Sequence, residues 1–442
     1  VSKLDSSGNY LWARSFGGTG THTGRSVAVD SSGNVYTTGD FKDTVDFDPD
    51  PSATAELTPN GSNDVFVSKL DSSGNYLWAK SFGGTGHDIA GSVAVDSSGN
   101  VYTTGNFTGT VDFDPNPLEI ANLEGGNDVY VSKLDSSGNY VWAKSFGTTD
   151  RGMGYSVVVD SSGNVYTTGY FEGTADFDPG AGTVELSAVV GWPGGDVFVS
   201  KLNSSGNYVW AKSFGGTKQD VGNSVAVDSS GNVYTTGFFQ GTADFDPGAG
   251  TTNLTTTGPA VGDDVFVSKL DSAGDLLWVK GFGGAEYSFF GNDDRGYSVA
   301  LDSSGNVYIT GEFLGTVDFD PGAGTTEFTS AGGDYANNDV FVSRLDSSGN
   351  LGTAVPAGFT LSTTTVSVAE TGTTAQFTVV LDAEPVSDVV IWSASSDSGE
   401  AQVGGGAGIG LTFTSLNWDI PQAFTITGVD DSIADGDQEA TF

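Results

Sequence analysis

A tryptophan that recurs at a near-constant interval is the feature that most limits what this chain can fold into. The spacings are 66, 64, 68 and 68 residues, between Trp12, Trp78, Trp142, Trp210 and Trp278. Each lies in a nearly identical segment, complete at Asn63–Phe82 (NDVFVSKLDSSGNYLWAKSF) and followed after a loop by Gly91–Phe107 (GSVAVDSSGNVYTTGNF). A period of this size indicates one supersecondary module per repeat, which buries its apolar faces against its neighbours.

Each repeat divides into four predicted strands, A to D. In the second copy these are Ser92–Asp96, Asn100–Phe107, Asp128–Asp135 and Asn139–Phe146. Val, Tyr, Thr, Phe and Trp dominate these runs, as is typical of strands. Strand C carries apolar residues on both faces, which predicts a sheet covered on both sides.

The A–B and C–D connections share the sequence Asp-Ser-Ser-Gly-Asn. It begins at Asp5, Asp30, Asp71, Asp96, Asp135, Asp160, Asp228, Asp302 and Asp346, with variants at Asn203 and Asp271. The first side chain can accept backbone N–H bonds within the turn, and the glycine supplies a positive φ. We therefore assign these aspartates a structural role in short hairpins.

Four antiparallel strands repeated radially predict an all-β fold, a β-propeller over residues 1–351. The segments SVAVDSSGNVYTTG and DVFVSKLDSSGNYLWAKSFGG resemble the bacterial β-propeller repeat of the SBBP type. We expect five blades, with Asn9–Phe16 completing the last blade as a closing strap. Six or seven blades are expected if sequence has been removed upstream of Val1. The B–C and D–A loops, long and variable, should share one face and carry any ligand site.

The period ends near Gly352, and residues 352–442 read as a second all-β domain, a β-sandwich. The segments Val366–Gly372, Leu411–Asp431 and Asp435–Phe442 resemble the Calx-β domain, whose last strand would be missing here. That family binds calcium through carboxylates at one end of the sandwich. The resemblance places calcium ligands at Glu370, Asp430, Asp431 and Glu439.

A second candidate calcium site follows strand B, which leaves through Asp-Phe-Asp-Pro in every copy. The pairs are Asp46 and Asp48, Asp112 and Asp114, Asp176 and Asp178, Asp244 and Asp246, and Asp318 and Asp320. Strand C begins with another aspartate, and antiparallel pairing would bring it to the same edge of the blade. Three carboxylates with loop carbonyls suit calcium. The alternative is that one aspartate caps the turn and the others are solvated.

Composition excludes several classes of function. The formal net charge is −40, which disfavours nucleic acid and anionic membrane surfaces and attracts cations. The chain has no cysteine, and no apolar run of about 18 residues that would span a bilayer. Catalysis has little support, since the only histidines, His22 and His87, form no ligand pair and no nucleophile motif is present.

We therefore expect a non-enzymatic module, extracellular or on the cell surface, that serves structure or adhesion and is stabilised by calcium. Its partners would be other copies of itself, or cell-surface proteins and glycans. Unpaired strand edges would allow polymerisation with neighbouring subunits. The alternative is a carbohydrate-binding propeller that uses the B–C and D–A loops, and an enzyme acting on glycans comes third.

Overall fold

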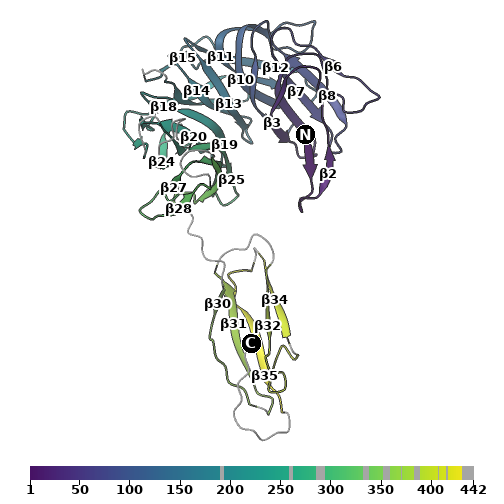
Figure 1. Ribbon diagram of the computed structural model, residues 1–442, viewed down its shortest axis with the longest axis vertical. Coiled ribbons are helices and arrows are strands. Elements are labelled where there is room, and N and C mark those ends of the chain that lie inside the picture. The colour runs from purple at the N-terminus through teal and green to yellow at the C-terminus, as the bar shows by residue number, and fades with distance from the viewer. Residues whose placement is uncertain are drawn as a thin grey trace. The chain divides into compact units, whose positions relative to one another are not determined.

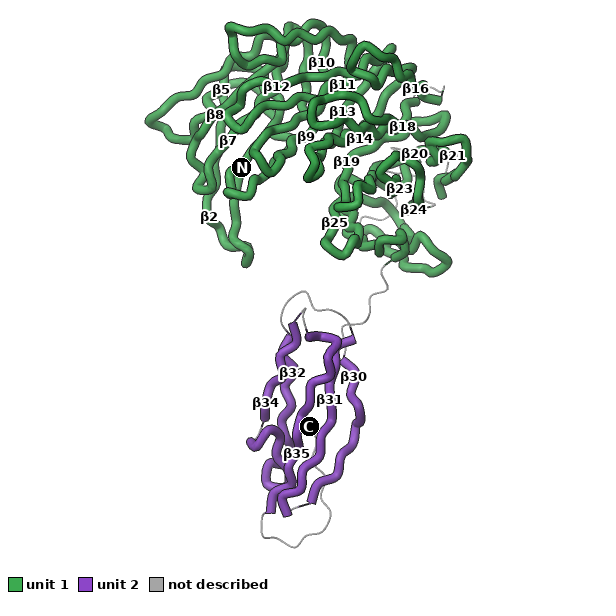
Figure 2. Tube along the Cα trace, turned by 180° about the vertical axis from the view of Figure 1, so that it is seen from behind, with its two compact units in different colours: residues 1–351 green, residues 352–442 purple. Residues whose placement is uncertain are grey.

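The computed structural model describes residues 1–189, 194–257, 262–284, 294–331, 338–351, 359–369, 371–382, 389–406, 408–414 and 417–430. All regular structure in these ranges is β-strand. The same residues contain no helix that is long and apolar enough to cross a membrane. The chain forms two compact units, residues 1–351 and residues 352–442 (Figures 1 and 2).

Unit 1 consists of successive antiparallel sheets in which strands A, B, C and D pair in chain order, as predicted. The A strands are β3 (His22–Val29), β9 (Ile89–Val95), β13 (Gly152–Val159), β19 (Val221–Val227) and β25 (Arg295–Leu301). The B strands are β4 (Val35–Phe41), β10 (Val101–Asp112), β14 (Val165–Phe171), β20 (Val233–Gln240) and β26 (Val307–Phe313). The C strands are β7 (Asp64–Leu70), β11 (Asn122–Leu134), β17 (Asp196–Leu202), β23 (Asp263–Leu270) and β29 (Asp339–Leu345). The D strands are β8 (Tyr76–Phe82), β12 (Tyr140–Thr148), β18 (Tyr208–Gly216) and β24 (Leu276–Phe282).

The B–C connections contain short hairpins that the sequence did not indicate. They are β5 (Val45–Asp46) with β6 (Glu56–Leu57), β15 (Thr174–Asp176) with β16 (Glu185–Ser187), β21 (Thr242–Asp244) with β22 (Asn253–Thr255), and β27 (Thr316–Asp318) with β28 (Glu327–Thr329). In the second blade the same hairpin continues β10 and β11. Hairpins pair with the preceding D strand, as in Gly147 with Asp176 and Gly215 with Asp244. Neighbouring blades are therefore joined by backbone hydrogen bonds as well as by packing.

The phenylalanine between the paired aspartates of each B–C connection is the centre of an interblade core. Phe113 is fully buried. Its ring centroid lies 5.0 Å from that of Phe82 in the preceding D strand and 5.2 Å from that of Tyr130 in its own blade. Phe47, Phe177, Phe245 and Phe319 pack in the same way. The aromatic ring of the Asp-Phe-Asp-Pro motif thus fills the gap between neighbouring blades. This packing role is the main reason that the motif recurs in every copy.

The recurring tryptophan fixes each blade to the C–D turn of the next. Trp210 Nε1 donates to the Ser272 carbonyl at 3.0 Å. The indole packs edge-on against the ring of Tyr166, with the two ring centroids 6.3 Å apart. Gly274 lies against the indole with φ of +86°, so a side chain there would be strained and would also contact the ring. The other four recurring tryptophans make the corresponding bond.

The first D strand does not close the last blade, which corrects the strap expected for Asn9–Phe16. β2 (Tyr10–Ala13) pairs instead with β1 (Ser2–Leu4) over three residues. Its Trp12 donates to the carbonyl of Ser72 in the first blade. Among the described residues the last blade is therefore a three-stranded sheet, β25–β26–β29.

Unit 2 contains a four-stranded sheet and a two-stranded ladder around one core. The sheet has the order β30 (Phe359–Leu361), β31 (Thr374–Leu381), β35 (Gln422–Gly428) and β33 (Ala401–Val403), and β32 (Val389–Ala394) pairs with β34 (Gly408–Phe413). Phe413 of β34 and Phe424 of β35 are buried in the same apolar cluster. Both groups of strands thus cover a common core.

Candidate functional site

The aspartates of the Asp-Ser-Ser-Gly-Asn turns are structural, as expected. Asp30 Oδ1 accepts from the backbone N–H groups of Ser32 and Asn34, both at 2.9 Å. Its Oδ2 accepts from the Asn34 amide and the Tyr36 hydroxyl. Burial tends to raise the pKa of Asp30, but the hydrogen bonds from Asn34 and Tyr36 outweigh it and hold the pKa below its ordinary value.

The paired aspartates predicted to bind calcium cap the B–C hairpins. Asp176 Oδ1 accepts from the N–H groups of Asp178 at 3.0 Å and Val184 at 2.9 Å, and Asp178 accepts from Gly180. The same bonds occur for Asp46 and Asp48, Asp112 and Asp114, Asp244 and Asp246, and Asp318 and Asp320. Within the described ranges no three His, Asp or Glu side chains converge as a metal site would require. Both aspartates of each pair therefore cap turn N–H groups, whereas the turn-capping alternative expected only one to do so. The calcium assignment to these pairs stays a prediction.

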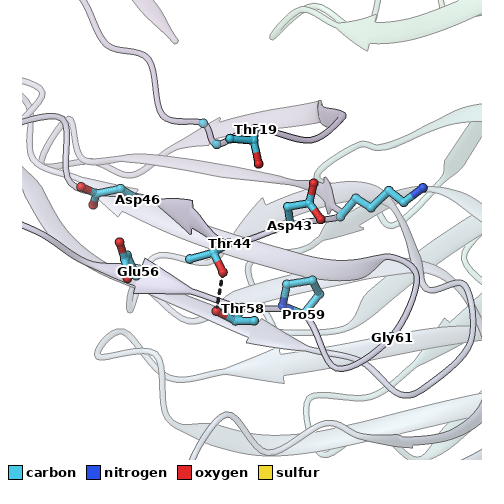
Figure 3. Close-up of a pocket in the computed structure, with 11 residues that line it drawn as sticks. Thr19, Asp43, Thr44, Asp46, Glu56, Thr58, Pro59 and Gly61 are labelled. Carbon is cyan, nitrogen blue, oxygen red and sulfur yellow. Dashed lines mark hydrogen bonds between the residues drawn. The ribbon is translucent and has the colours of Figure 1, made fainter.

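A shallow hollow of about 630 Å³ lies beside the first of these hairpins. Figure 3 shows Asp46 and Glu56 near one end and Asp43 toward the other, with the Thr44 and Thr58 hydroxyls 2.8 Å apart between them. Equivalent hydroxyl pairs join three other hairpins. The hydroxyl pair therefore belongs to the repeat rather than to a site specific to this blade.

Of the residues assigned by the Calx-β resemblance, Glu370, Asp431 and Glu439 lie outside the described residues. Asp430 directly follows Val429, whose N–H donates to the Glu400 carbonyl at 2.9 Å. Asp397 occupies the same turn, where its carbonyl accepts from the N–H of Ala401 at 3.1 Å. Unit 2 thus places Asp397, Glu400 and Asp430 on neighbouring segments, but these three side chains do not converge as a metal site would require.

Sequence reasoning missed a set of buried carboxylates between blades. Asp196, at the start of a C strand, and Asp220, before the next A strand, flank Gly215, whose added Cβ would lie 2.7 Å from one carboxyl and 2.8 Å from the other. Both side chains are buried, and Asp196 Oδ1 has no hydrogen-bond partner in the described part of the chain. Asp64 with Asp88, and Asp264 with Asp294, occupy the equivalent positions.

Burial dominates the ionisation of these carboxyls. It raises the pKa of Asp64 to about 6 and those of Asp196 and Asp264 to about 7. The neighbouring charge adds to the rise at Asp64 and Asp264. In the first blade His22 replaces the second carboxylate, and its Nε2 accepts from the Gly18 N–H at 3.1 Å. An aspartate recurring immediately before strand A was the sequence signal for this set.

Two apolar faces that are buried at every internal blade boundary are exposed at the two ends of the run of blades. The side chains of Val340 and Val342 on β29 are 85% and 74% exposed, whereas their counterparts on the other C strands are at most 1% exposed. On β3, Val27 is 59% exposed, whereas Val93, Val157, Val225 and Val299 of the other A strands are buried. At internal boundaries these two kinds of valine belong to the same core cluster.

Comparison with known proteins agrees with the repeat architecture. Residues 11–40, 77–109, 209–237 and 278–312 match the family described as Beta-propeller repeat (SBBP). An uncharacterized WD repeat-containing protein of Acanthamoeba polyphaga mimivirus is 28% identical over 243 residues, which are 49% of this chain and 17% of that protein. The regulatory protein FlaEY of Caulobacter vibrioides is 30% identical over 168 residues, 36% of this chain and 17% of that protein.

The chain therefore spans about a sixth of the length of these curated relatives. A crystal structure of a protein of unknown function from Bacteroides caccae aligns with 65% of this chain and 88% of its own, at 9% identity and a TM-score of 0.27. Such a score does not define a shared fold. What the comparisons establish is that SBBP β-propeller repeats occur in four segments of this all-β chain.

Proposed function

We propose that this chain is a non-enzymatic structural or adhesive module, extracellular or at the cell surface, that assembles head to tail. The observation that carries the proposal is the pair of exposed valine faces on β29 and β3. Each face matches the surface that covers its counterpart at the internal blade boundaries. A contact between unlike faces of two copies is heterologous, so it extends into a filament or closes into a ring.

The assembly places β29 of one copy beside β2 of the next. β2 now pairs with β1 over only three residues, whereas β7 and β8 of a complete blade pair over six. In the assembly, β2 of the second copy releases its own β1 and pairs with β29 of the first copy, which lengthens the ladder. The same contact covers Val340 and Val342 of the first copy with Val27 of the second copy. Removal of the exposed apolar area from water supplies the driving force.

Sedimentation velocity with single-face variants tests the assembly. We expect the unmodified chain to form concentration-dependent oligomers, and Val342→Lys and Val27→Lys each to be monomeric because a buried lysine opposes the contact. A mixture of the two variants should form dimers only, since each retains one intact face. Ile120→Lys, at an exposed apolar side chain remote from both faces in sequence, is the matched control and should oligomerise normally.

An unmodified chain that stays monomeric at all concentrations would exclude the assembly. Oligomers that persist in both single variants would also exclude it.

We further propose that calcium stabilises unit 2 through Asp430 and the neighbouring acidic end. The support is that the backbone segment of Asp430 adjoins the turn that holds Asp397 and Glu400, together with the net charge of −40. The three side chains do not converge by themselves, so the site requires further oxygen ligands. A ligand that binds only the folded state at about 100 times its Kd stabilises it by about 2.7 kcal/mol. Calorimetry should therefore show a higher Tm for the unit 2 transition in calcium than in chelator.

Magnesium at equal ionic strength is the control for screening, and Asp430→Asn should remove most of the calcium-dependent rise. An equal rise in magnesium, or an unchanged rise in Asp430→Asn, would remove this site from the proposal.

A further inference from the structure

The repeats differ from one another at two positions of their inner strands, although the residues on either side recur. The position before the A-strand serine holds Arg25, Gly91, Tyr155, Asn223 and Tyr297. The position before the last phenylalanine of the B strand holds Asp40, Asn106, Tyr170, Phe238 and Glu312. The fold tolerates residues of very different size and polarity at these two positions. The large polar and aromatic side chains found there are therefore available for another role.

These positions lie together because the A strands adjoin one another. β3 contacts β9, β9 contacts β13, β13 contacts β19 and β19 contacts β25. The Asn223 amide donates to the Gly296 carbonyl of the next blade at 2.9 Å. Figure 2 shows β9, β13, β19 and β25 along the inner side of unit 1. We call the side chains at the two variable positions the inner-strand site.

Arg25 of the inner-strand site, and Arg295 two residues before Tyr297, are each held in place by a buried carboxylate. Arg25 Nε donates to Asp40 at 2.8 Å. Arg295 donates to Asp263 at 2.7 Å and lies 4.8 Å above the ring of Phe238. The arginine side chains nevertheless remain 38% and 33% exposed. Such pairs orient a planar guanidinium whose exposed edge can donate hydrogen bonds.

Aromatic rings complete the arrangement. Tyr155 and Tyr170 are stacked, with ring centroids 6.0 Å apart and an interplanar angle of 28°. Burial raises the pKa of Tyr155, and the charges of Arg25 and Arg295 partly offset the rise. The charges of Arg25 in the first blade and Arg295 in the fifth blade thus both lower the pKa of Tyr155 in the third blade. Tyr297, which donates to Glu312, is about half exposed.

The inner-strand site also contains a polar atom without a partner. The Oδ1 atom of Asn106 is buried and accepts no hydrogen bond in the described part of the chain. A buried amide oxygen that lacks a donor costs roughly 1–3 kcal/mol.

We propose that the inner-strand site binds a neutral saccharide. Stacked tyrosines offer flat apolar faces, and fixed arginine, asparagine and carboxylate groups offer paired donors and acceptors for hydroxyl groups. An anionic ligand is disfavoured because each arginine contacts a carboxylate and the chain carries a charge of −40. This site lies on strands, so it differs from the loop site expected of a carbohydrate-binding propeller.

An array of neutral hexasaccharides of gluco, galacto, manno and xylo configuration, with oligogalacturonate as the anionic comparison, tests the proposal. We expect binding to at least one neutral class and not to oligogalacturonate. In titration calorimetry with that hexasaccharide, Tyr155→Ala and Arg25→Lys should each weaken binding at least tenfold. Tyr155→Phe should retain most of the affinity, because the ring is kept.

Tyr10→Ala and Arg344→Ala, at exposed side chains outside the inner-strand site, are the matched controls and should bind normally. Circular dichroism melting verifies that each variant is folded. The proposal is overturned if no neutral hexasaccharide binds, if only oligogalacturonate binds, or if folded Tyr155→Ala and Arg25→Lys bind like the unmodified chain. Because calcium and head-to-tail assembly do not enter this measurement, its failure leaves the proposed function intact.

Discussion

Trp210→Ala should lower the free energy of unfolding of unit 1 by about 3–5 kcal/mol, as truncation of a buried aromatic side chain generally does. The indole is only 8% exposed, and it contacts Tyr166, Gly274 and the Ser272 carbonyl. Its loss removes apolar contact and an interblade hydrogen bond together. Chemical denaturation followed by near-ultraviolet circular dichroism measures the change.

The chain supplies its own control in Trp392, a tryptophan of unit 2 that is 73% exposed. Trp392→Ala should change the stability by about 0.5 kcal/mol or less, as is usual at exposed positions. If Trp210→Ala were as mild as Trp392→Ala, the interblade contact would not be the reason that the tryptophan recurs. Gly274→Ala should also destabilise unit 1, because its φ is positive and its Cβ would contact Trp210 and Lys212.

Strand positions within the repeats were predictable because each strand carries β-branched and aromatic residues between two recognisable turns. Ser92–Asp96 was expected where the structure has Ile89–Val95. The sequence pattern did not indicate the earlier start of β9, because the ladder between β9 and β10 has a register shift between Thr104 and Gly105. The small hairpins were missed because two or three residues, as in Thr174–Asp176, show no alternation.

The role of the paired aspartates could not be decided from residue type. An aspartate that binds calcium and one that caps a turn look alike in sequence, and the difference depends on which N–H groups face the carboxylate. Asp176 Oδ1 meets two such groups. The phenylalanine between the two aspartates was the stronger structural signal, since a large apolar residue recurring in a polar loop indicates burial.

The inner-strand site was open to sequence reasoning by another route. Comparison of the repeats position by position separates residues that recur, such as the turn aspartates, from those that vary, such as Arg25 and Tyr155. What the sequence could not supply is distance: Asp196 and Asp220 meet only because Gly215 leaves room between two blades. Periodicity therefore predicted the scaffold, and packing determined which side chains meet on it.

Acidification from pH 8 toward pH 5 should increase the stability of unit 1. Burial raises the pKa of Asp196 to about 7, well above the ordinary value of an aspartate near 3.8. Between these values the folded state binds more protons than the unfolded state, so stability falls as pH rises through this window. About two units of this window lie between pH 5 and pH 7, so at about 1.4 kcal/mol per pKa unit one such carboxyl accounts for roughly 3 kcal/mol of the expected difference. The turn aspartates have the opposite sign, because their lowered pKa values make stability fall below about pH 4.

Urea unfolding at pH 5 and pH 8 measures this dependence, and Asp196→Asn isolates it. Asparagine keeps an oxygen for the Val189 N–H that Asp196 now accepts, but it cannot ionise. The variant should therefore be more stable than the unmodified chain at pH 8 and should show a smaller difference between the two pH values. Asp71→Asn is the control, since Asn203 already fills the same turn position and accepts the two corresponding backbone N–H bonds. The Asn75 hydrogen bonds lower the pKa of Asp71, so this change should weaken the protein at pH 8. If Asp196→Asn left the pH dependence unchanged, the ionisation of Asp196 would not be its source.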